Sequence, residues 1–327
     1  MLKCVYTAKN PWDGPHVAIL KKAGFEFEHI YDTPNVFEEQ GLVSVLKDAS
    51  AVIAGSEPYT AKILDQLPKL RVIARAGVGF DAVDLEACDH HQIAVCTTPG
   101  VNHHSVAEHA IALLMGVARG FPGLDQKVRK ADWSRKPFPR VMGKTIGLVG
   151  LGRIGQATAT RAIGLGMHVI AYDPYANTEF VAQWKIELVD LNTLLARSDF
   201  VSLHCPVTKE SINLMNQERF ARMKKGSVLI NTARGQLVDE TALLETLKAG
   251  HLAAAGLDVF QEEPLPLNSP LLGMENVFVS GHVAGLDDQS LHDTNKMCAE
   301  NIVSLYEGRW PAGCVQNLRG KEESWQW

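Results

Sequence analysis

The 327 residues are enough for two domains of ordinary size with substantial buried cores. The 32 Lys and Arg residues are outnumbered by 37 Asp and Glu residues, and no long basic run is present, which argues against a nucleic-acid-binding surface. No apolar run approaches the ~18 residues of a membrane span, and the six cysteines have irregular spacing. We therefore expect a reduced, cytoplasmic protein that binds neither membranes nor nucleic acids.

The first hundred residues alternate between strand patterns and helix patterns, and the first strand pattern differs from a secretory signal. The expected strands cover residues 2–7, 25–31, 51–54, 72–74 and 93–96, and the expected helices cover residues 15–23 and 36–46 and follow the N-caps Thr60 and Asp84. Strands that are separated by helices pair in parallel, so this region predicts a domain with its own parallel sheet.

The alternation stops at residues 97–100, and one long amphipathic helix is expected over residues 103–129. Further strands are expected at residues 145–149, 167–173, 200–203, 227–230, 252–257 and 277–280, followed by a final helix over 287–307. We predict a dinucleotide-binding domain over residues 101–285. Residues 1–100 and 286–327 then form a second domain, and the two crossings of the chain form a hinge over a cleft.

A glycine-rich segment, Gly150-Leu-Gly-Arg-Ile-Gly155, lies between a buried strand pattern and a helix pattern. In a Rossmann fold the first glycine permits a tight turn, the second lets a pyrophosphate approach the backbone, and the third lets the helix pack on the strand. The helix N-terminus then presents free N–H groups to the phosphates. Alone, this pattern also fits a plain strand–helix turn.

Asp173 ends the next strand, about 20 residues after the first glycine, where a Rossmann fold holds the adenosine ribose hydroxyls. A carboxylate at this position repels a 2′-phosphate, so Asp173 favours NAD over NADP. The alternative is a turn residue before Pro174.

Polar side chains follow four later strands, at the edge where ligands bind in open α/β sheets. These are His204-Cys205-Pro206, Thr232-Ala233-Arg234, Asp258 and His282. Each of them could be a capping or turn residue. A histidine that is paired with a carboxylate suits proton exchange with an alcohol, and an arginine can hold a carboxylate or polarise a carbonyl.

At this point the sequence resembles the D-isomer-specific 2-hydroxyacid dehydrogenases over nearly its whole length. The matching motifs are Arg75-Ala-Gly-Val-Gly-Phe-Asp81, Ser105-Val-Ala-Glu108, Gly150-Leu-Gly-Arg-Ile-Gly155, Asn231-Thr-Ala-Arg-Gly235, Asp258-Val-Phe-x-x-Glu-Pro264 and His282-Val-Ala-Gly285. The resemblance implies a Rossmann domain, a flavodoxin-like substrate domain, a homodimer formed through the nucleotide domain, and NAD-dependent conversion of a small 2-hydroxyacid or 2-oxoacid.

The resemblance also implies roles for individual residues. His282 is the expected general acid/base, Glu263 its partner, and Arg234 the substrate-binding arginine. Val78 and Gly79 are expected to offer backbone N–H groups to the substrate carboxylate, and Arg75 is a further expected substrate ligand. The expected cofactor-binding positions are Gly150, Gly152, Arg153, Ile154, Gly155, Asp173, Pro206, Thr232, Ala233, Asp258, His282 and Gly285.

Within the family the sequence is most similar to the phosphoglycerate dehydrogenase branch, on Arg75-Ala-Gly77 and Trp133-Ser-Arg135. Three features differ from that branch. The strand end where the branch often has a phosphate-binding arginine is here Ala54-Gly-Ser56, and the proline that usually precedes the catalytic histidine is Gly281. The sequence also ends before a regulatory domain. The candidate substrate is therefore 3-phosphoglycerate, and the alternative hypothesis is that the protein is a glyoxylate or hydroxypyruvate reductase. Phosphate recognition would depend on Arg75, with Arg135 as a second candidate.

Two other readings stay open. Corepressors of the C-terminal binding protein type resemble the same family, so a non-catalytic, dinucleotide-sensing regulator is the rival function. The patches His90-His91 and His103-His104 with His109 suggest a metal site, but His104 and His109 are off a single helix face and no HExxH or Cys pairing accompanies them. We expect no metal.

Overall fold

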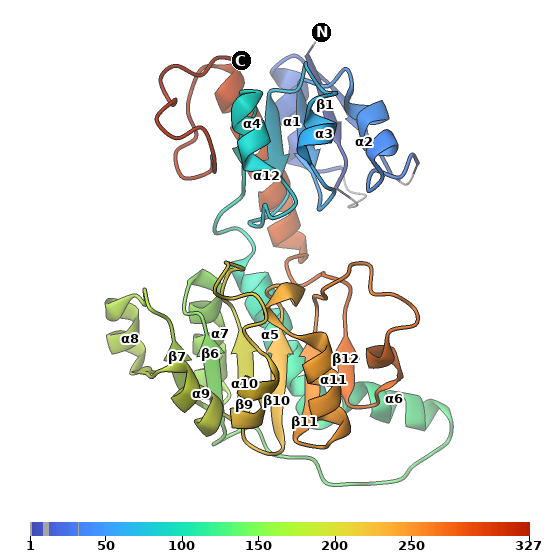
Figure 1. Cartoon of the computed structure of the whole chain (residues 1–327), viewed down its shortest axis with the longest axis vertical. Coiled ribbons are helices and arrows are strands. Elements are labelled where there is room, and N and C mark those ends of the chain that lie inside the picture. Colours follow the sequence, from blue (N-terminus) through green and yellow to red (C-terminus); the bar gives the residue numbers. More distant parts are fainter. Residues whose placement is uncertain (1, 9–12, 32) are drawn as a thin grey trace. The chain divides into compact units, whose positions relative to one another are not determined.

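The computed structural model describes residues 2–8, 13–31 and 33–327 (Figure 1). The chain divides into two compact units. Unit 1 consists of the residues up to Asn102 together with Asp287–Trp327, and unit 2 consists of His103–Leu286. Each unit contains one sheet whose strands all pair in parallel. The prediction of an α/β fold with two parallel sheets is confirmed.

Unit 1 is built on a five-stranded sheet with the order β2-β1-β3-β4-β5. The strands are β1 (Leu2–Tyr6), β2 (Phe25–His29), β3 (Ala51–Ala54), β4 (Val72–Arg75) and β5 (Ala94–Cys96). This is the flavodoxin-like order, as predicted. Successive residues of a strand face opposite sides, so Val5 packs in one hydrophobic cluster while Cys4 and Tyr6 pack in the other.

Helices cover both faces of this sheet. On one face lie α2 (Glu39–Leu46), α3 (Ala61–Leu64) and α4 (Leu85–His90), and on the other α1 (Pro15–Lys22) packs against α12 (Asp288–Tyr306). Asp84 caps α4 as expected, because its carboxylate accepts a hydrogen bond from Ala87 N at 3.0 Å.

Unit 2 is built on a seven-stranded sheet with the order β12-β11-β10-β9-β6-β7-β8. The strands are β6 (Thr145–Val149), β7 (His168–Tyr172), β8 (Glu187–Leu188), β9 (Phe200–Leu203), β10 (Ser227–Asn231), β11 (Leu252–Leu257) and β12 (Val277–Val279). From β8 inward this is the Rossmann order 3-2-1-4-5-6 with one further strand. The order reverses between β6 and β9, beside the strand that carries the glycine-rich segment.

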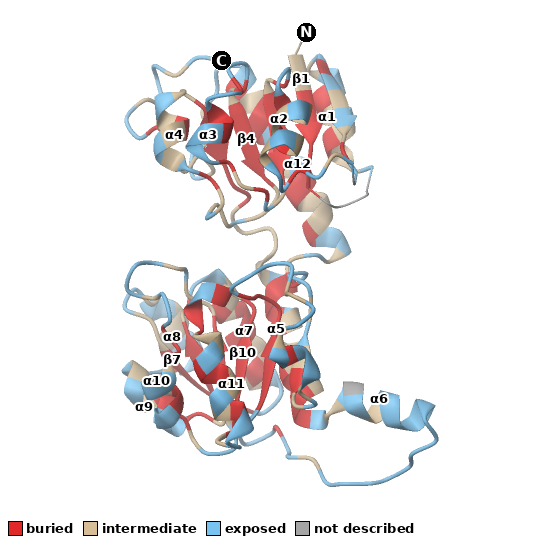
Figure 2. Ribbon diagram, turned by 45° about the vertical axis from the view of Figure 1, so that its right-hand side comes forward, coloured by how far each residue is buried: buried red, intermediate tan, exposed pale blue. Residues whose placement is uncertain are grey.

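The helices of unit 2 also form two layers, and the buried residues lie between them and the sheet (Figure 2). On one face lie α5 (His103–Arg119), α7 (Arg153–Gly164) and α8 (Thr178–Trp184), and on the other α9 (Leu191–Arg197), α10 (Gln217–Arg222) and α11 (Glu240–Lys248). Two short 3-10 helices, η1 (Gly235–Leu237) and η2 (Pro270–Gly273), lie in loops.

Two helix predictions were wrong in extent. The helix expected over residues 36–46 begins only at Glu39. The helix expected over residues 103–129 is two helices, because Gly120 adopts a left-handed conformation (φ 64°) between α5 and α6 (Phe121–Arg129). A Cβ at residue 120 would collide with the ring of Phe138, so a side chain there would require the ring to shift.

The C-terminal tail packs on unit 1 through aromatic contacts that were not predicted from the sequence. Trp325 and Trp327 contact the hydrophobic cluster that contains Leu20 and Ile302. The indole of Trp325 donates a hydrogen bond to Gln92 O at 2.9 Å, and the Arg71 guanidinium lies 5.8 Å from the centre of its ring. Within residues 2–8, 13–31 and 33–327 no helix has the length and apolar character needed to cross a membrane.

Candidate functional site

The glycine-rich segment connects β6 to the N-terminus of α7. Gly150 has φ 99°, and a Cβ there would lie 2.7 Å from the carbonyl carbon of His204. A Cβ at Gly155 would collide with the Gly150 carbonyl oxygen. Gly152, by contrast, has open space around its Cβ position and caps α7 without a side-chain hydrogen bond. A pyrophosphate can therefore approach the backbone at Gly152 and the free N–H groups that follow it. Of the next two expected ligands, Arg153 is exposed and Ile154 is half-buried.

Asp173 lies just after β7, next to this segment. Its Oδ2 accepts a hydrogen bond from Leu151 N at 2.6 Å, and its Oδ1 accepts one from Tyr175 N at 2.7 Å. The carboxylate thus joins the glycine-rich turn to the turn after β7. Its expected contact with the ribose of a dinucleotide stays a prediction.

The ends of β9 and β10 carry buried polar atoms without hydrogen-bond partners in the part of the chain that the structure describes. They are His204 Nδ1 and Thr232 Oγ1. Burial lowers the pKa of His204 to about 4, so its ring is neutral near pH 7. Pro206 and Ala233 belong to the same strand-end segments. Because these segments lie at the edge where Rossmann folds bind ligands, unused hydrogen-bonding capacity there fits a dinucleotide.

His282 and Glu263 form a hydrogen-bonded pair. The distance between His282 Nδ1 and Glu263 Oε2 is 2.7 Å, and the exposed fractions of the two side chains are 43% and 33%. Glu263 Oε1 also accepts a hydrogen bond from Phe260 N at 2.9 Å. The carboxylate orients the ring and accepts from Nδ1, so Nε2 is the nitrogen that can exchange a proton with a substrate.

The environment of Glu263 favours its ionised form. Burial raises the pKa of this carboxyl, but the hydrogen bond and charge of His282, the Phe260 N–H and the charge of Arg234 outweigh burial, so the pKa is lowered. An ionised carboxylate beside the ring stabilises an imidazolium.

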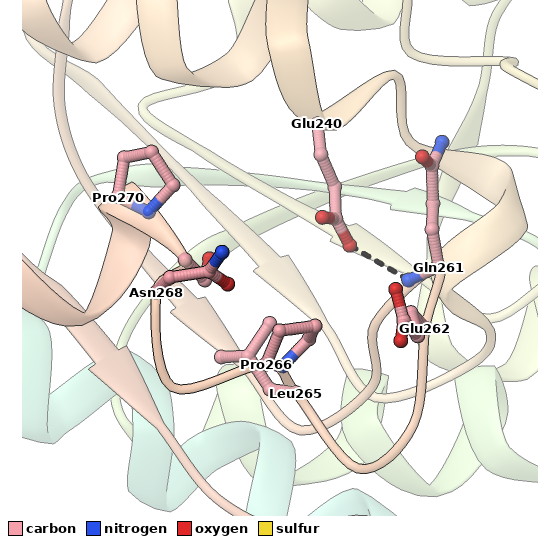
Figure 3. A pocket seen from close by; sticks show the side chains of 8 residues that line it. Glu240, Gln261, Glu262, Leu265, Pro266, Asn268 and Pro270 are labelled. Atoms are coloured by element: carbon pink, nitrogen blue, oxygen red, sulfur yellow. Dashed lines mark hydrogen bonds between the residues drawn. The ribbon is translucent and has the colours of Figure 1, made fainter.

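The loop that carries Glu263 is held from its outer side by Glu240 and Gln261. Gln261 N donates to Glu240 Oε1 at 2.7 Å (Figure 3). Gln261 Nε2 donates to Val238 O, also at 2.7 Å. A surface pocket on this loop is lined by Glu240, Gln261, Glu262, Leu265, Pro266, Asn268, Ser269 and Pro270. Neither His282 nor Glu263 lines it, so this pocket is not the candidate site.

Arg234 follows β10 at the start of η1. Asn231 shapes the turn, because its Oδ1 accepts from Ala233 N at 3.0 Å and its Nδ2 donates to Arg234 O at 2.8 Å. A Cβ at Gly235 would collide with the Phe260 carbonyl group, so glycine lets this turn pack against the segment that leads to Glu263. Arg234 lies near enough to Glu263 for its charge to lower the pKa of that carboxyl.

Asp258 is fully buried, and its carboxylate faces the backbone around His282. Oδ1 accepts from Val283 N at 3.0 Å, and Oδ2 accepts from Ala284 N at 2.9 Å. Gly285 follows on the same turn. In this structure Asp258 therefore holds the turn that carries His282, and its expected contact with nicotinamide stays a prediction.

In unit 1, Arg75 is buried, with 8% of its surface exposed. Its Nε donates to Gly79 O at 3.1 Å, and its Nη1 donates to Ala54 O at 3.2 Å. The guanidinium thus shapes the loop that holds Val78 and Gly79. Its expected contact with a substrate stays a prediction.

Glu57 is a second buried charged residue of unit 1, and no role was predicted for it from the sequence. Glu57 is 1% exposed and accepts hydrogen bonds from Gly55 N at 3.0 Å and from the Tyr59 hydroxyl at 3.1 Å. Thr7 donates a further hydrogen bond to it. Its only signal in the sequence is a carboxylate three residues after a buried strand. Across the described ranges no group of three or more His, Cys, Asp or Glu side chains is arranged to hold a metal ion.

These features define an α/β protein with a dinucleotide-binding unit. Residues 111–284 match the family model described as "D-isomer specific 2-hydroxyacid dehydrogenase, NAD binding domain". The chain belongs to the D-isomer-specific 2-hydroxyacid dehydrogenase family, as the motifs predicted, and it carries the family's NAD-binding domain.

Three relatives illustrate the similarity. D-3-phosphoglycerate dehydrogenase of Archaeoglobus fulgidus is 39% identical over 307 residues, which are 93% of this chain and 58% of that protein. Glyoxylate reductase of Korarchaeum cryptofilum is 39% identical over 281 residues, 84% of this chain and 85% of that one. D-lactate dehydrogenase from Aquifex aeolicus, solved with NAD and lactic acid, has a TM-score of 0.83 and 28% identity over 96% of this chain and 98% of that one. The chain thus spans little more than half the length of the phosphoglycerate dehydrogenase.

Proposed function

We propose that the protein is an NAD-dependent oxidoreductase that interconverts a small D-2-hydroxyacid and its 2-oxoacid. The observation that carries this proposal is the His282–Glu263 pair, with its 2.7 Å hydrogen bond, in the unit that matches the NAD-binding domain. Such a pair supplies the proton transfer that must accompany hydride transfer at a carbinol carbon. NAD, when bound, supplies the hydride acceptor or donor.

The side chains of the protein have three further roles: proton transfer, substrate binding and cofactor binding. His282 Nε2 takes the hydroxyl proton during oxidation and returns it during reduction, while the ionised Glu263 stabilises the imidazolium. Arg234 holds the substrate carboxylate and stabilises the negative charge that develops on the C2 oxygen. Gly150, Gly152, Gly155 and Asp173 hold the dinucleotide, and the remaining strand-end residues contribute to that site.

Relatives suggest two kinds of substrate, a phosphorylated hydroxyacid and a small 2-oxoacid such as glyoxylate. The guanidinium of Arg75 is hydrogen-bonded to Gly79 O and Ala54 O. These bonds do not decide between the two, because Arg234 also donates to a backbone carbonyl, that of Ala233. Both kinds of substrate are therefore candidates.

The test is an NADH absorbance assay with glyoxylate, hydroxypyruvate, a branched 2-oxoacid and, in the oxidative direction, 3-phosphoglycerate. We expect turnover of at least one 2-oxoacid, with NADH preferred to NADPH. NADH binding without turnover of any of these compounds would contradict the proposal and favour the regulator of corepressor type. A partner pull-down with and without NADH would then test that alternative.

We also propose a homodimer in the cytoplasm. In the segment from residue 121 to 142, Phe121, Trp133 and Met142 are 61%, 73% and 59% exposed. Figure 2 shows most of α6 as exposed, and a long loop follows this helix. An apolar arm of this kind fits a second copy of the chain. Light scattering should give twice the chain mass, and Trp133→Glu should lower it. The six free thiols support a reducing compartment.

A further inference from the structure

His282 has an unusual backbone conformation. Its φ is 55°, in the left-handed region that residues other than glycine rarely adopt. Such a conformation persists only where the surrounding structure holds it, and it is often found at functional sites. The residue before it is Gly281, which does not restrict the backbone as a proline would. The turn must therefore be fixed by contacts from elsewhere in the chain.

The first set of contacts comes from Asp258. Three successive backbone N–H groups point at this residue: His282 N donates to the Asp258 carbonyl oxygen at 2.8 Å, and the next two donate to its carboxylate. The carboxylate is fully buried, so these hydrogen bonds are shielded from water. A buried carboxylate is expected to have hydrogen-bond partners on its remaining lone pairs as well.

The second set of contacts comes from α5. Ser105 and His109 are four residues apart, so they lie on one face of the helix. Ser105 Oγ donates to Ala284 O at 2.8 Å, which holds the far end of the turn. His109 Nε2 lies 2.8 Å from Ser280 Oγ, just before the turn. One helix face thus contacts both ends of the segment that carries His282.

The direction of the hydrogen bonds follows from the donors available. Ser280 Oγ donates to Asp258 Oδ1 at 2.6 Å, and a serine hydroxyl has only one hydrogen. His109 Nε2 must therefore be the donor to Ser280 Oγ. The result is a chain of hydrogen bonds from His109 to Ser280 to Asp258, and from Asp258 to the backbone of residues 283 and 284.

We propose that His109 and Ser280 are positioning residues for the general acid/base. They fix the Asp258 carboxylate, and through it the left-handed turn that sets the direction of the His282 ring. Neither side chain needs to touch substrate or cofactor for this role. The expected effect on kcat rests on the proposed function, whereas the hydrogen-bond geometry does not depend on it.

The kinetic experiment compares the wild-type enzyme with His109→Ala and His109→Gln, using the 2-oxoacid that is reduced fastest. Gln keeps an N–H donor near the position of Nε2. We expect His109→Ala to lower kcat about 10- to 100-fold, because a small misplacement of a catalytic group has effects of this size. The affinity for NADH, measured by fluorescence, should change less than about threefold, and His109→Gln should recover most of kcat.

Matched controls separate positioning from general damage. His168→Ala removes an exposed histidine of β7 and should leave kcat unchanged. Ser280→Ala should repeat the loss, and Ser280→Thr, which keeps a hydroxyl, should not. If His109→Ala does not fold, the Ser280 pair decides the question. Wild-type kcat in the alanine variants, or no recovery in the variants that keep the hydrogen bond, would overturn the proposal.

A second measurement does not need turnover. In protein with isotope-labelled histidine, the His282 ring signals should move in His109→Ala and Ser280→Ala, and should stay in place in His168→Ala. Unmoved ring signals would overturn the positioning role. If the wild-type protein reduced no 2-oxoacid but these signals moved as expected, the proposed function would fail while the positioning contact stood.

Discussion

Both sheets place charged side chains at their carboxyl edges, but the two edges use them differently. In unit 2 His282 and Glu263 pair with each other and keep 43% and 33% of their side chains exposed. In unit 1 Arg75 and Glu57 are 8% and 1% exposed. Their hydrogen bonds go to neighbouring carbonyl, N–H and hydroxyl groups. Exposed pairs can exchange protons with a ligand, whereas buried charges need all their partners from the protein.

The comparison teaches that a charge at a strand end is not by itself a ligand for substrate. The buried charges of unit 1 fix the shape of two loops, residues 54–57 and 75–81. If the loop around Val78 and Gly79 presents N–H groups to a substrate carboxylate, then Arg75 acts on the substrate only through the loop. In unit 2 the proposed function assigns a direct role to His282 and Glu263, whereas the buried Asp258 holds a backbone turn.

The largest effect should come from the pair in unit 2. A positioned base contributes roughly 10²–10⁴-fold in rate, so His282→Ala should lose about that much kcat while NADH binding stays nearly intact. Glu263→Gln removes the charge that stabilises the imidazolium, so reduction should shift to lower pH. Because groups that act as a unit are not additive, the double variant should be little worse than His282→Ala. Losses that multiply would refute the pairing.

The next effect concerns Arg75 and tests the contrast directly. Arg75→Ala leaves Gly79 O and Ala54 O without this donor, so the loop should loosen. We expect KM to rise by about the same factor for glyoxylate and for a phosphorylated substrate, and thermal unfolding to occur several degrees lower. Lys62→Ala, at an exposed position of unit 1, is the control. A loss confined to the phosphorylated substrate would make Arg75 a phosphate ligand after all.

Asp173 lies between the two cases, since its carboxylate is at the edge of unit 2 but accepts hydrogen bonds from backbone N–H groups. We expect Asp173→Ala to weaken NAD and to relax the exclusion of NADP, each by about tenfold, which corresponds to ~1.4 kcal/mol. Titration of both cofactors into the wild-type and variant proteins checks this. Equal use of NAD and NADP by the unmutated protein would show that Asp173 does not set the preference.

Local sequence patterns predicted the parts of the fold that depend on neighbouring residues. The strands other than β8, the cap at Asp84 and the glycine-rich turn follow from spacing and residue type. The break at Gly120 was missed because an apolar repeat continues on both sides of it. The proline at position 122, which stands in the first turn of α6, is a local signal for this break. The contact with Phe138 is visible only in the structure.

In the candidate site, too, the sequence indicated contacts between residues close in the chain and missed a contact between distant ones. The His282–Glu263 pair spans 19 positions within one motif-rich segment and was anticipated from the sequence. The contact between His109 and Ser280 joins residues 171 positions apart, so His109 was considered only for a metal site. The role of Arg75 in phosphate recognition came from the resemblance to phosphoglycerate dehydrogenases and stays a prediction, but its burial could not be read from the sequence.

The smallest expected effect is on stability and comes from His16. This histidine of unit 1 is fully buried, in contrast to His282. The ring of His16 lies 5.2 Å from the rings of Tyr6 and Phe27, measured between centroids. Among the residues that the structure describes, neither of its nitrogens has a hydrogen-bond partner. Burial first, and then the charge of His29, lower the pKa of His16 to about 4, although Asp13 opposes this.

Between that value and the pKa of about 6.5 of an unfolded histidine, the unfolded chain binds more protons than the folded one. The contribution of His16 to stability should therefore fall as the pH drops from about 6.5 to about 4, by up to ~1.4 kcal/mol per pH unit. Urea midpoints at pH 7 and pH 5 should differ less in His16→Leu than in the wild type, while His168→Leu, at an exposed position, should keep the wild-type difference. His204, whose pKa burial also lowers to about 4, contributes equally in all three proteins. Identical pH dependence in His16→Leu and the wild type would mean that the folded state does not lower the pKa of His16.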